Sequence, residues 1–343
     1  MSDFQTVHGF EDVWRPPVRP RAIRTATALR PGAMGAGQSA RARLTRIASR
    51  APEVMVKVTG RTRDGAHLRA HLDYISRNGQ LDLEGPDGAL VVGKREVAEL
   101  ARDWATAAEA DNHRRANSPV SLSVILSMPA GTNEIALRDA ARAFAIEIFA
   151  DQHDYVFTVH TDTPRPHAHL SVCAHGRTGE RLNPKKADLE TWRQTFAQAL
   201  RDRGVEAEAT PRRARGVTLK AEWAPLRKIR ERHEAGLGEP AQVRRSAYRE
   251  AAKAAFRGGT ARPVWEDRTV ARQAKVRGLY LAQAKVLGRS ANPADQALGA
   301  KVEAFVRSMP QPDSQRLALA RELRAANAAL DRNRPDDGRE RGR

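Results

Sequence analysis

Three histidines within ten positions are the residues of this sequence best placed to do chemistry. They lie in the segment His160-Thr-Asp-Thr-Pro-Arg-Pro-His167-Ala-His169. The residues after His167 alternate with period two, which is typical of a β-strand whose residues i and i+2 face the same side. His167 and His169 are therefore expected to project side by side, with the two prolines turning the chain so that His160 joins them. Three neutral imidazoles that converge form a common divalent-metal site, and three protein ligands leave coordination positions open for a substrate.

A structural interpretation competes with this one. A His-x-His pair on one strand also arises when two polar residues simply face solvent, and the pair alone decides nothing. The nearby His160, the acidic Asp162 and the turn between the two strands favour the metal site.

Composition limits the class of protein. The 343 residues include one cysteine, Cys173, which excludes an intramolecular disulfide and a cysteine-based zinc cage. We expect a reducing compartment. No apolar run approaches membrane-spanning length, and residues 1–50 show no apolar core of a signal peptide, so we expect a soluble intracellular protein without membrane insertion.

The positive charge is concentrated outside the histidine segment. Residues 51–211 carry a net charge of −3, whereas residues 212–290 carry 20 Lys and Arg against seven Asp and Glu, a net +13. Such a block predicts a polyanionic partner, since neutralising phosphates releases counterions and drives binding. A general arginine bias and a solvated helical face are the competing explanations.

Hydrophobic periodicity predicts an α+β fold. The pattern indicates a mainly antiparallel central sheet with helices on one face, while serines and histidines line the other, open face. A basic helical C-terminal region follows. The predicted strands span 54–59, 120–128, 154–160 and 167–174, and the predicted helices span 66–77, 94–111, 133–149 and 185–203.

Tyr74 is the best candidate nucleophile among the four tyrosines. It lies on the first predicted helix, on a face offset from the apolar stripe of Leu68, Leu72 and Ile75, so its hydroxyl could reach the open face of the sheet. A partly buried tyrosine with no chemical role is the competing interpretation. The other tyrosines are predicted on a core face (Tyr155) or in the basic C-terminal helices (Tyr248, Tyr280).

These motifs together resemble the conjugative and mobilisation relaxases of the HUH endonuclease superfamily. The likeness covers about residues 54–204 and is carried by Ala70-His-Leu-Asp-Tyr74-Ile-Ser-Arg77-Asn-Gly79 and by the three-histidine segment. The order of motifs also agrees, with the tyrosine first, a serine strand ending near Ser127 in the middle, and the histidines last. The histidine motif is fairly specific, and the serine motif is weak on its own.

The resemblance implies a metal-assisted tyrosine transesterification. It assigns Mg²⁺ or Mn²⁺ to His160, His167 and His169, and attack on a scissile phosphate to Tyr74, giving a 5′-phosphotyrosine. Imidazole is an uncommon ligand for Mg²⁺, so the choice over Zn²⁺ rests on the resemblance. Asp162 is expected to orient a metal-binding imidazole, with tyrosine deprotonation or a turn cap as alternatives. Ser127 and Arg77 are expected to contact DNA.

The same resemblance suggests the biological setting and its rivals. It implies nicking and rejoining at a plasmid transfer origin, with partners that include transfer-origin DNA, relaxosome accessory proteins and a type IV coupling protein. The protein would act in the bacterial cytoplasm and could be exported to a recipient cell with the transferred strand. The alternatives are an HUH replication initiator, a three-histidine metallohydrolase without a covalent intermediate, and a non-catalytic DNA-binding accessory protein with a structural metal.

Four parts of the chain are expected. Residues 1–50 would be a mostly disordered basic arm, 51–211 the nuclease domain and 212–290 a basic helical region that binds DNA. Residues 291–343 would hold a helical segment and a disordered arginine-rich tail that resembles export signals of type IV secretion substrates.

Overall fold

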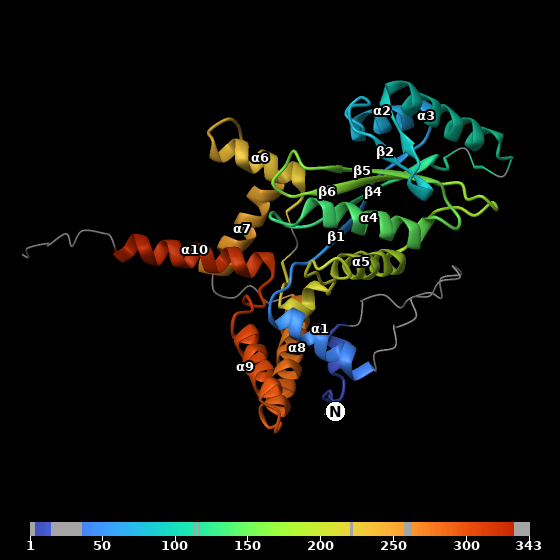
Figure 1. Cartoon of the computed structure of the whole chain (residues 1–343). Coiled ribbons are helices and arrows are strands. Elements are labelled where there is room, and N and C mark those ends of the chain that lie inside the picture. Colours follow the sequence, from blue (N-terminus) through green and yellow to red (C-terminus); the bar gives the residue numbers. More distant parts are fainter. Residues whose placement is uncertain are drawn as a thin grey trace, which may run out of the picture. The chain divides into compact units, whose positions relative to one another are not determined.

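The computed structural model describes residues 4–14, 36–112, 114–115, 117–219, 222–256 and 263–332 (Figure 1). The chain forms two compact units. The first contains residues 14–211 and the second contains residues 7–13 together with 212–343. The division falls after residue 211, and each unit has its own core.

The first unit is built on a six-stranded antiparallel sheet in the order β1-β4-β6-β5-β2-β3. Its strands are β1 (Met55–Thr62), β2 (Leu83–Glu84), β3 (Leu90–Val91), β4 (Ser121–Ser127), β5 (Tyr155–His160) and β6 (His167–Cys173). The predicted α+β class with a mainly antiparallel sheet is confirmed. The two short strands pair with each other and flank the turn at Pro86–Gly88.

One face of the sheet packs against α4 (Glu134–Phe149) and α5 (Lys186–Arg201), as Figure 1 shows. Alternate strand residues such as Val124, Leu170 and Phe157 meet Phe144 and Phe196 from these helices in one buried cluster. Each large apolar side chain that is fully buried contributes about 1.5–3 kcal/mol to the free energy of unfolding, so this cluster is the main source of the unit's stability. It also fixes the register, because a slip by one residue would turn every apolar strand residue to the opposite face.

The opposite face, which was expected to be open with all helices on the other side, is partly covered by α2 (Gly65–Ile75) and α3 (Gly93–Ala110). Leu68 and Leu72 pack with Val97, Val156 and Cys173 in a second buried cluster. Strand residues that were expected to line an open face are consequently buried, and the group comprises Ser121, Ser123, Ser127 and Ser171. The apolar stripe of α2 needs a partner, and Val156 and Cys173 supply one on the histidine face.

The N-terminal arm is more ordered than expected. Residues Ala36–Ala48 form the helix α1, and Leu44 and Ile47 are buried on its apolar side. Arg46 from this helix pairs with the buried Glu208 at 2.8 Å. Residues Phe10–Val13 form a short 3-10 helix that packs with the second unit. The prediction of a mostly disordered arm is therefore wrong for these residues, and 15–35 lie outside the described part.

The second unit is helical. After a 3-10 turn at Arg212–Arg215 it contains α6 (Ala224–Glu234), α7 (Gln242–Phe256), α8 (Val264–Gly288), α9 (Pro293–Arg307) and α10 (Gln315–Arg332). Tyr280 of α8 is fully buried against Phe10 and Phe305, at ring-centroid distances of 5.4 and 5.6 Å. Helix α8 lies before residue 290 and α9 after it, and the two helices pack against each other. The expected division of the chain at residue 290 therefore separates two helices that belong to one packed unit. The expected C-terminal tail from residue 333 lies outside the described residues, among which no helix is long and apolar enough to cross a membrane.

Candidate active site

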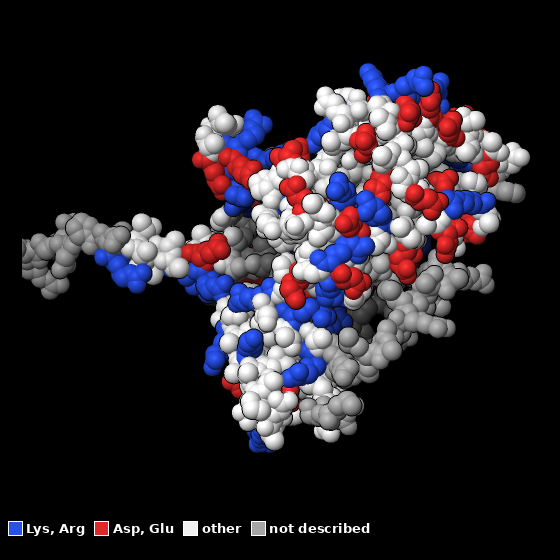
Figure 2. Space-filling model, viewed as in Figure 1, with Lys and Arg blue, Asp and Glu red and all other residues white. Residues whose placement is uncertain are grey.

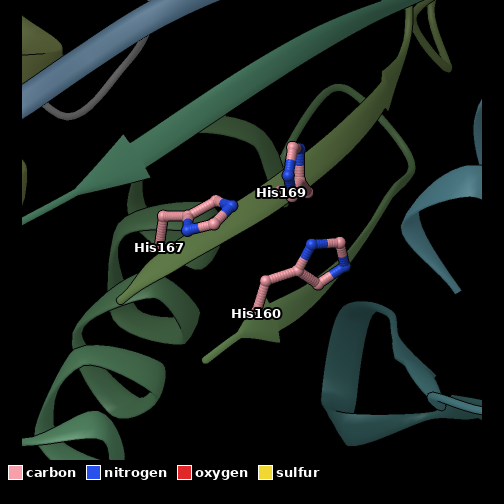
Figure 3. Close-up of side chains that lie close together, drawn as sticks. All are labelled: His160, His167 and His169. Carbon is pink, nitrogen blue, oxygen red and sulfur yellow. The ribbon is translucent and has the colours of Figure 1, made fainter. Parts of the chain in front are cut away.

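The three histidines converge at the ends of two neighbouring strands (Figure 3). His160 ends β5 and lies directly opposite His167 of β6 in the antiparallel register, and His169 follows on the same face. One ring nitrogen from each residue lies within 4.8 Å of the others. The closest pair of ring centroids, His160 and His169, is 4.5 Å apart. The period-two alternation and the turn thus produce the predicted cluster.

Backbone carbonyls hold the outward nitrogens of two of these rings. His160 Nε2 donates to the carbonyl oxygen of Ile75 at 2.7 Å, and His167 Nδ1 donates to that of Arg165 at 3.0 Å. In a neutral ring each contact selects the tautomer whose other nitrogen carries a lone pair, as is usual for metal-binding histidines. Figure 3 shows one nitrogen of His160 turned toward the other two imidazoles. Asp162 was expected to orient a ring in this way. The two backbone carbonyls that do so were not predicted from the sequence.

Burial favours the neutral form of two of the three histidines. Desolvation, followed by the neighbouring His160 and His167, lowers the pKa of His169 to about 3, and desolvation also lowers the pKa of His160. Neutral imidazole is the form that binds a metal. The Nε2 atom of His169 is buried and has no hydrogen-bond partner among the described residues. A buried nitrogen without a partner is costly, and a cation at the centre of the cluster would satisfy it. The residues therefore fit a divalent metal.

Tyr74 stands at the edge of this cluster on the last turn of α2. Its ring centroid is 5.7 Å from that of His169 and 6.2 Å from that of His160, in edge-to-face arrangements. The side chain is 56% exposed. It therefore combines proximity to the histidines with access for a large substrate, which the three other tyrosines do not share.

Arg77 and Asp162 form an ion pair beside the same cluster. Arg77 Nη2 also donates at 3.3 Å to His160 Nδ1, the nitrogen that a metal would take, so a bound metal would replace this contact. The guanidinium carbon of Arg77 lies 5.6 Å from the centre of the Tyr74 ring. Arg77 and Asn78 adopt positive φ angles of 53° and 59° just beyond α2, which turns the chain back toward the sheet. Asp162 is thus bound to Arg77, not to the second nitrogen of a metal-binding histidine, which corrects the favoured expectation for this residue.

Three further polar residues lie near the histidine cluster. They are Ser127 and the hydrogen-bonded pair His71 and Ser123, a pair that was assigned no role from the sequence. Ser127 lies opposite His167 in the register of β4 and β6, so it shares the histidine face, but it is 8% exposed. His71, one turn before Tyr74, shares a hydrogen bond of 2.9 Å between its Nε2 and the hydroxyl of Ser123. Desolvation, with a smaller effect of His67, lowers the pKa of His71 to about 4. The spacing of His71 and Tyr74 on one helix was the available signal.

Comparison with known proteins gives results that agree with this geometry. Residues 84–205 match the family model of the relaxase MobA/VirD2-like nuclease domain. The chain is 26% identical over 185 residues to the T-DNA border endonuclease VirD2 of Rhizobium radiobacter, covering 48% of this chain and 43% of that protein. It is also 26% identical over 184 residues to the protein of that name from Agrobacterium fabrum (strain C58), covering 48% of this chain and 41% of the relative.

These similarities have defined limits. The chain spans less than half the length of the curated relatives it matches. The family match contains all three histidines but begins after Tyr74. The assignment of Tyr74 to the candidate site is therefore supported by its distance from the histidines and not by this match. No solved structure matches the chain.

Proposed function

We propose, from the premise that this chain is a relaxase of the HUH endonuclease superfamily, that it nicks and rejoins one DNA strand at a transfer origin. The observation that carries the proposal is the approach of Tyr74, from a helix, to His160 and His169 on two strands. A nucleophile beside a metal-binding cluster is the arrangement that phosphoryl transfer requires. The printed names of the relatives, T-DNA border endonucleases, favour cleavage at a defined DNA sequence.

The proposed reaction exchanges one phosphodiester for another. The Tyr74 oxygen forms a bond to the scissile phosphorus, and the bond from phosphorus to the 3′ oxygen breaks. The phenolic proton is lost from Tyr74 and a proton is gained by the departing oxygen, which leaves a 5′-phosphotyrosine and a free 3′-hydroxyl. Because one ester replaces another, the step needs no nucleotide cofactor. The 3′-hydroxyl can reverse it and rejoin the strand.

His160, His167 and His169 would hold Mg²⁺ or Mn²⁺. The ion would polarise the scissile phosphate and stabilise the charge that develops on its oxygens. The carbonyls of Ile75 and Arg165 keep two of the rings in the tautomer that binding requires. The exposure of Tyr74 leaves room for a strand to lie across the cluster.

Arg77 and Asp162 have linked roles in this proposal. Arg77 contacts both the Tyr74 ring and His160, so its charge lies where a phosphate of the bound strand would sit. Asp162 is a positioning residue, since its carboxylate holds Arg77. Ser127 would contact the DNA backbone from the same face, although its burial requires the strand to approach closely.

The second unit would bind DNA that flanks the nick. Its basic charge and the exposed Trp223 and Trp265 suit a phosphate backbone and unstacked bases. Figure 2 shows lysine and arginine side chains on the helices of this unit. In the proposed setting the protein acts in the bacterial cytoplasm with relaxosome accessory proteins. A type IV coupling protein would then export it with the transferred strand.

A covalent adduct tests the proposal directly. The purified protein is incubated with single-stranded oligonucleotides and supercoiled plasmid carrying the DNA upstream of its own gene, with Mg²⁺ or Mn²⁺. A denaturing gel is then examined for a protein–DNA adduct. We expect a metal-dependent adduct that Tyr74→Phe abolishes and that Tyr248→Phe, a control at a partly exposed tyrosine of α7, leaves unchanged.

Other outcomes would favour the alternatives. An adduct that survives Tyr74→Phe would move the nucleophile elsewhere. Cleavage without any adduct would favour a metallohydrolase, and tight DNA binding without cleavage would favour an accessory protein. Cleavage at a replication origin in place of a transfer origin would identify a replication initiator.

A further inference from the structure

The free edge of the sheet has a basic pocket that the chemistry described above does not use. Strand β1 is the last strand on this side, and its ladder with β4 is interrupted by a bulge between Val58 and Gly60. The pocket has a volume of about 440 Å³. Binding sites for small ligands have volumes of about 300–1,000 Å³, so one nucleotide has room here. The pocket is lined by Val58, Thr59, Gly60, Arg61, Arg63, Asn117 and Pro119.

The charge of this pocket is positive and uncompensated. Its lining contains Arg61 and Arg63 and no acidic residue. Both arginines are exposed, and within the described part of the chain no carboxylate pairs with either. Arg114 lies alongside and donates to the carbonyl oxygens of Arg63 and Ser118, which satisfies hydrogen bonds without neutralising its charge. The surrounding segment 51–211 has a net charge of −3, so this concentration of cations is local.

The backbone of the edge strand adds further donors. Within the described residues no strand pairs with the outer side of β1, so its outward N–H groups have no partner in a strand ladder. The bulge also takes Thr59 out of the ladder, because Val58 pairs with Val124 and Gly60 pairs with Ser123. Free backbone N–H groups beside guanidinium groups are typical of phosphate-binding sites.

A row of residues connects this edge with the histidine cluster. In the register of the sheet, Lys57 of β1 lies opposite Ile125, and Ile125 lies opposite His169. Directly opposed residues share a face, so Lys57 is on the histidine face, two strand spacings or about 10 Å from His169. Lys57 is exposed, and beyond the bulge Gly60 lies opposite Ser123 on the same face. Arg61 lies opposite Leu122, so it projects from the other side of the edge strand.

Protection of a free edge is the simplest alternative explanation. Lysine and arginine on an edge strand discourage pairing with another chain. That explanation accounts for Lys57, Arg61 and Arg63 but not for the pocket between the bulge and Asn117, nor for Arg114 on a separate segment.

We infer that this pocket at the β1 edge binds one nucleotide of the DNA strand that crosses the histidine cluster. Arg61 and Arg63 pair with its phosphate, and the Asn117 amide faces the base edge, where asparagine can donate and accept hydrogen bonds. The inference rests on the proposed nicking function and adds a substrate contact a few nucleotides from the scissile phosphate. It assigns the pocket a role in holding the strand, not in breaking the bond.

The first test measures binding apart from chemistry. The full chain carrying Tyr74→Phe is titrated in EDTA with fluorescent oligothymidylate at several salt concentrations, with and without Arg61→Ala or Arg63→Ala. We expect several-fold weaker binding for each pocket variant, and a logarithmic salt dependence that is shallower by about 0.7 for each phosphate that is no longer neutralised. Arg138→Ala removes the same charge from an exposed position on α4 and should leave both quantities unchanged.

The second test locates the strand. Oligothymidylate with a single photoreactive 4-thiothymidine at successive positions is cross-linked to the chain, and the modified peptides are identified by mass spectrometry. We expect one position to cross-link to residues 58–63 or 117–119. Pocket variants that bind like Arg138→Ala, with cross-links only near Tyr74, would overturn the inference while the adduct assay still supports nicking. Failure of the wild-type chain both to bind the strand and to form an adduct would reject the two together.

Discussion

At the residue scale, the site depends on which form each titratable side chain takes. Three histidines are buried or half-buried at this site: His71 on α2, and His160 and His169 on the strands beside it. Burial lowers the pKa of each. A lowered pKa favours the neutral ring, which suits metal binding at His160 and His169. For His71 the neutral ring preserves a hydrogen bond with Ser123 that ties α2 to β4. The same burial that prepares the site therefore makes the unit sensitive to acid.

His71 gives a measurable form of this sensitivity. Its pKa is about 4 in the folded chain and about 6.5 in an unfolded one, so between these values only the unfolded chain takes up the proton. Stability is therefore fully present above pH 6.5 and falls as the pH decreases toward 4. We expect His71 to account for a loss of about 2 kcal/mol in the free energy of unfolding between pH 7 and pH 5.

Urea unfolding of the wild type and His71→Gln at the two pH values, in EDTA, measures this contribution. The amide of glutamine does not titrate and can still bond to Ser123, so the variant should lose less stability on acidification. Other buried histidines titrate in both proteins, and the comparison therefore rests on the difference between them. Equal losses would show that His71 titrates normally in the folded chain.

At the element scale, α2 does most to position the site. Asp64 caps its first turn by accepting from the backbone N–H of His67, and Tyr74 lies on its last turn. Beyond the helix the chain reverses through Arg77, Asn78 and Gly79, all with positive φ. This turn brings Arg77 against His160 and supplies the carbonyl of Ile75 to the same ring. The end of one helix thus supports the proposed nucleophile Tyr74, the guanidinium group of Arg77 and the proposed metal ligand His160 together.

Gly79 is where this arrangement should be most vulnerable. Its φ is +82°, and a Cβ atom there would lie 2.4 Å from the backbone nitrogen of Lys94 at the start of α3. We expect Gly79→Ala to lower the free energy of unfolding by more than about 1 kcal/mol and to reduce adduct formation, because Tyr74 and Arg77 would shift.

Gly88→Ala is the matched control for this prediction. Gly88 also has a positive φ, +76°, but a Cβ atom there would meet no atom within 4 Å. The control therefore measures the conformational cost without the clash. Thermal unfolding and the adduct assay should show a clearly larger effect at position 79. Similar effects of the two substitutions would mean that α3 can move away from Gly79 at little cost.

The histidine cluster was predictable because period-two alternation is a local signal, and the turn after His160 leaves few ways to place the second strand. The face on which α2 packs was not predictable, since its apolar stripe fits any apolar surface. The Ile75 and Arg165 carbonyls carry no side-chain signal at all. Helix α1 was missed because its segment holds few large apolar residues among its arginines, and because the Arg46–Glu208 ion pair joins residues far apart in the sequence.

At the scale of the whole molecule, chemistry and charge are divided between two units. Both buried clusters described for the sheet unit consist of residues from 54 to 209, so neither cluster contains a residue of the helical unit. The helical unit has its own core around Tyr280 and contains the most basic segment of the chain. In the proposed function, this division would separate the breaking of a phosphodiester from much of the electrostatic attraction to DNA.

A shortened chain that comprises residues 14–211 tests this division. It retains Tyr74, the three histidines and the β1 edge, and it omits both the basic helices and the Phe10 segment that packs with them. We expect it to fold and to form the adduct on a short oligonucleotide at saturating concentration. Its affinity for longer DNA should be much weaker, and its logarithmic dependence on salt shallower, because each neutralised phosphate of a single strand contributes about 0.7 to the slope.

The two measurements distinguish two roles for the helical unit. If the shortened chain forms the adduct but binds long DNA with the salt dependence of the full chain, then the +13 of residues 212–290 does not face phosphate, and a protein partner becomes the better explanation. If it folds but forms no adduct even at saturation, the helical unit contributes to the reaction itself. A variant of the whole 343-residue chain in which Arg227, Arg244 and Arg249 are replaced by glutamine keeps the helices but removes charge, and so separates charge from fold. Weaker binding there, with the adduct retained, assigns the attraction to these helices.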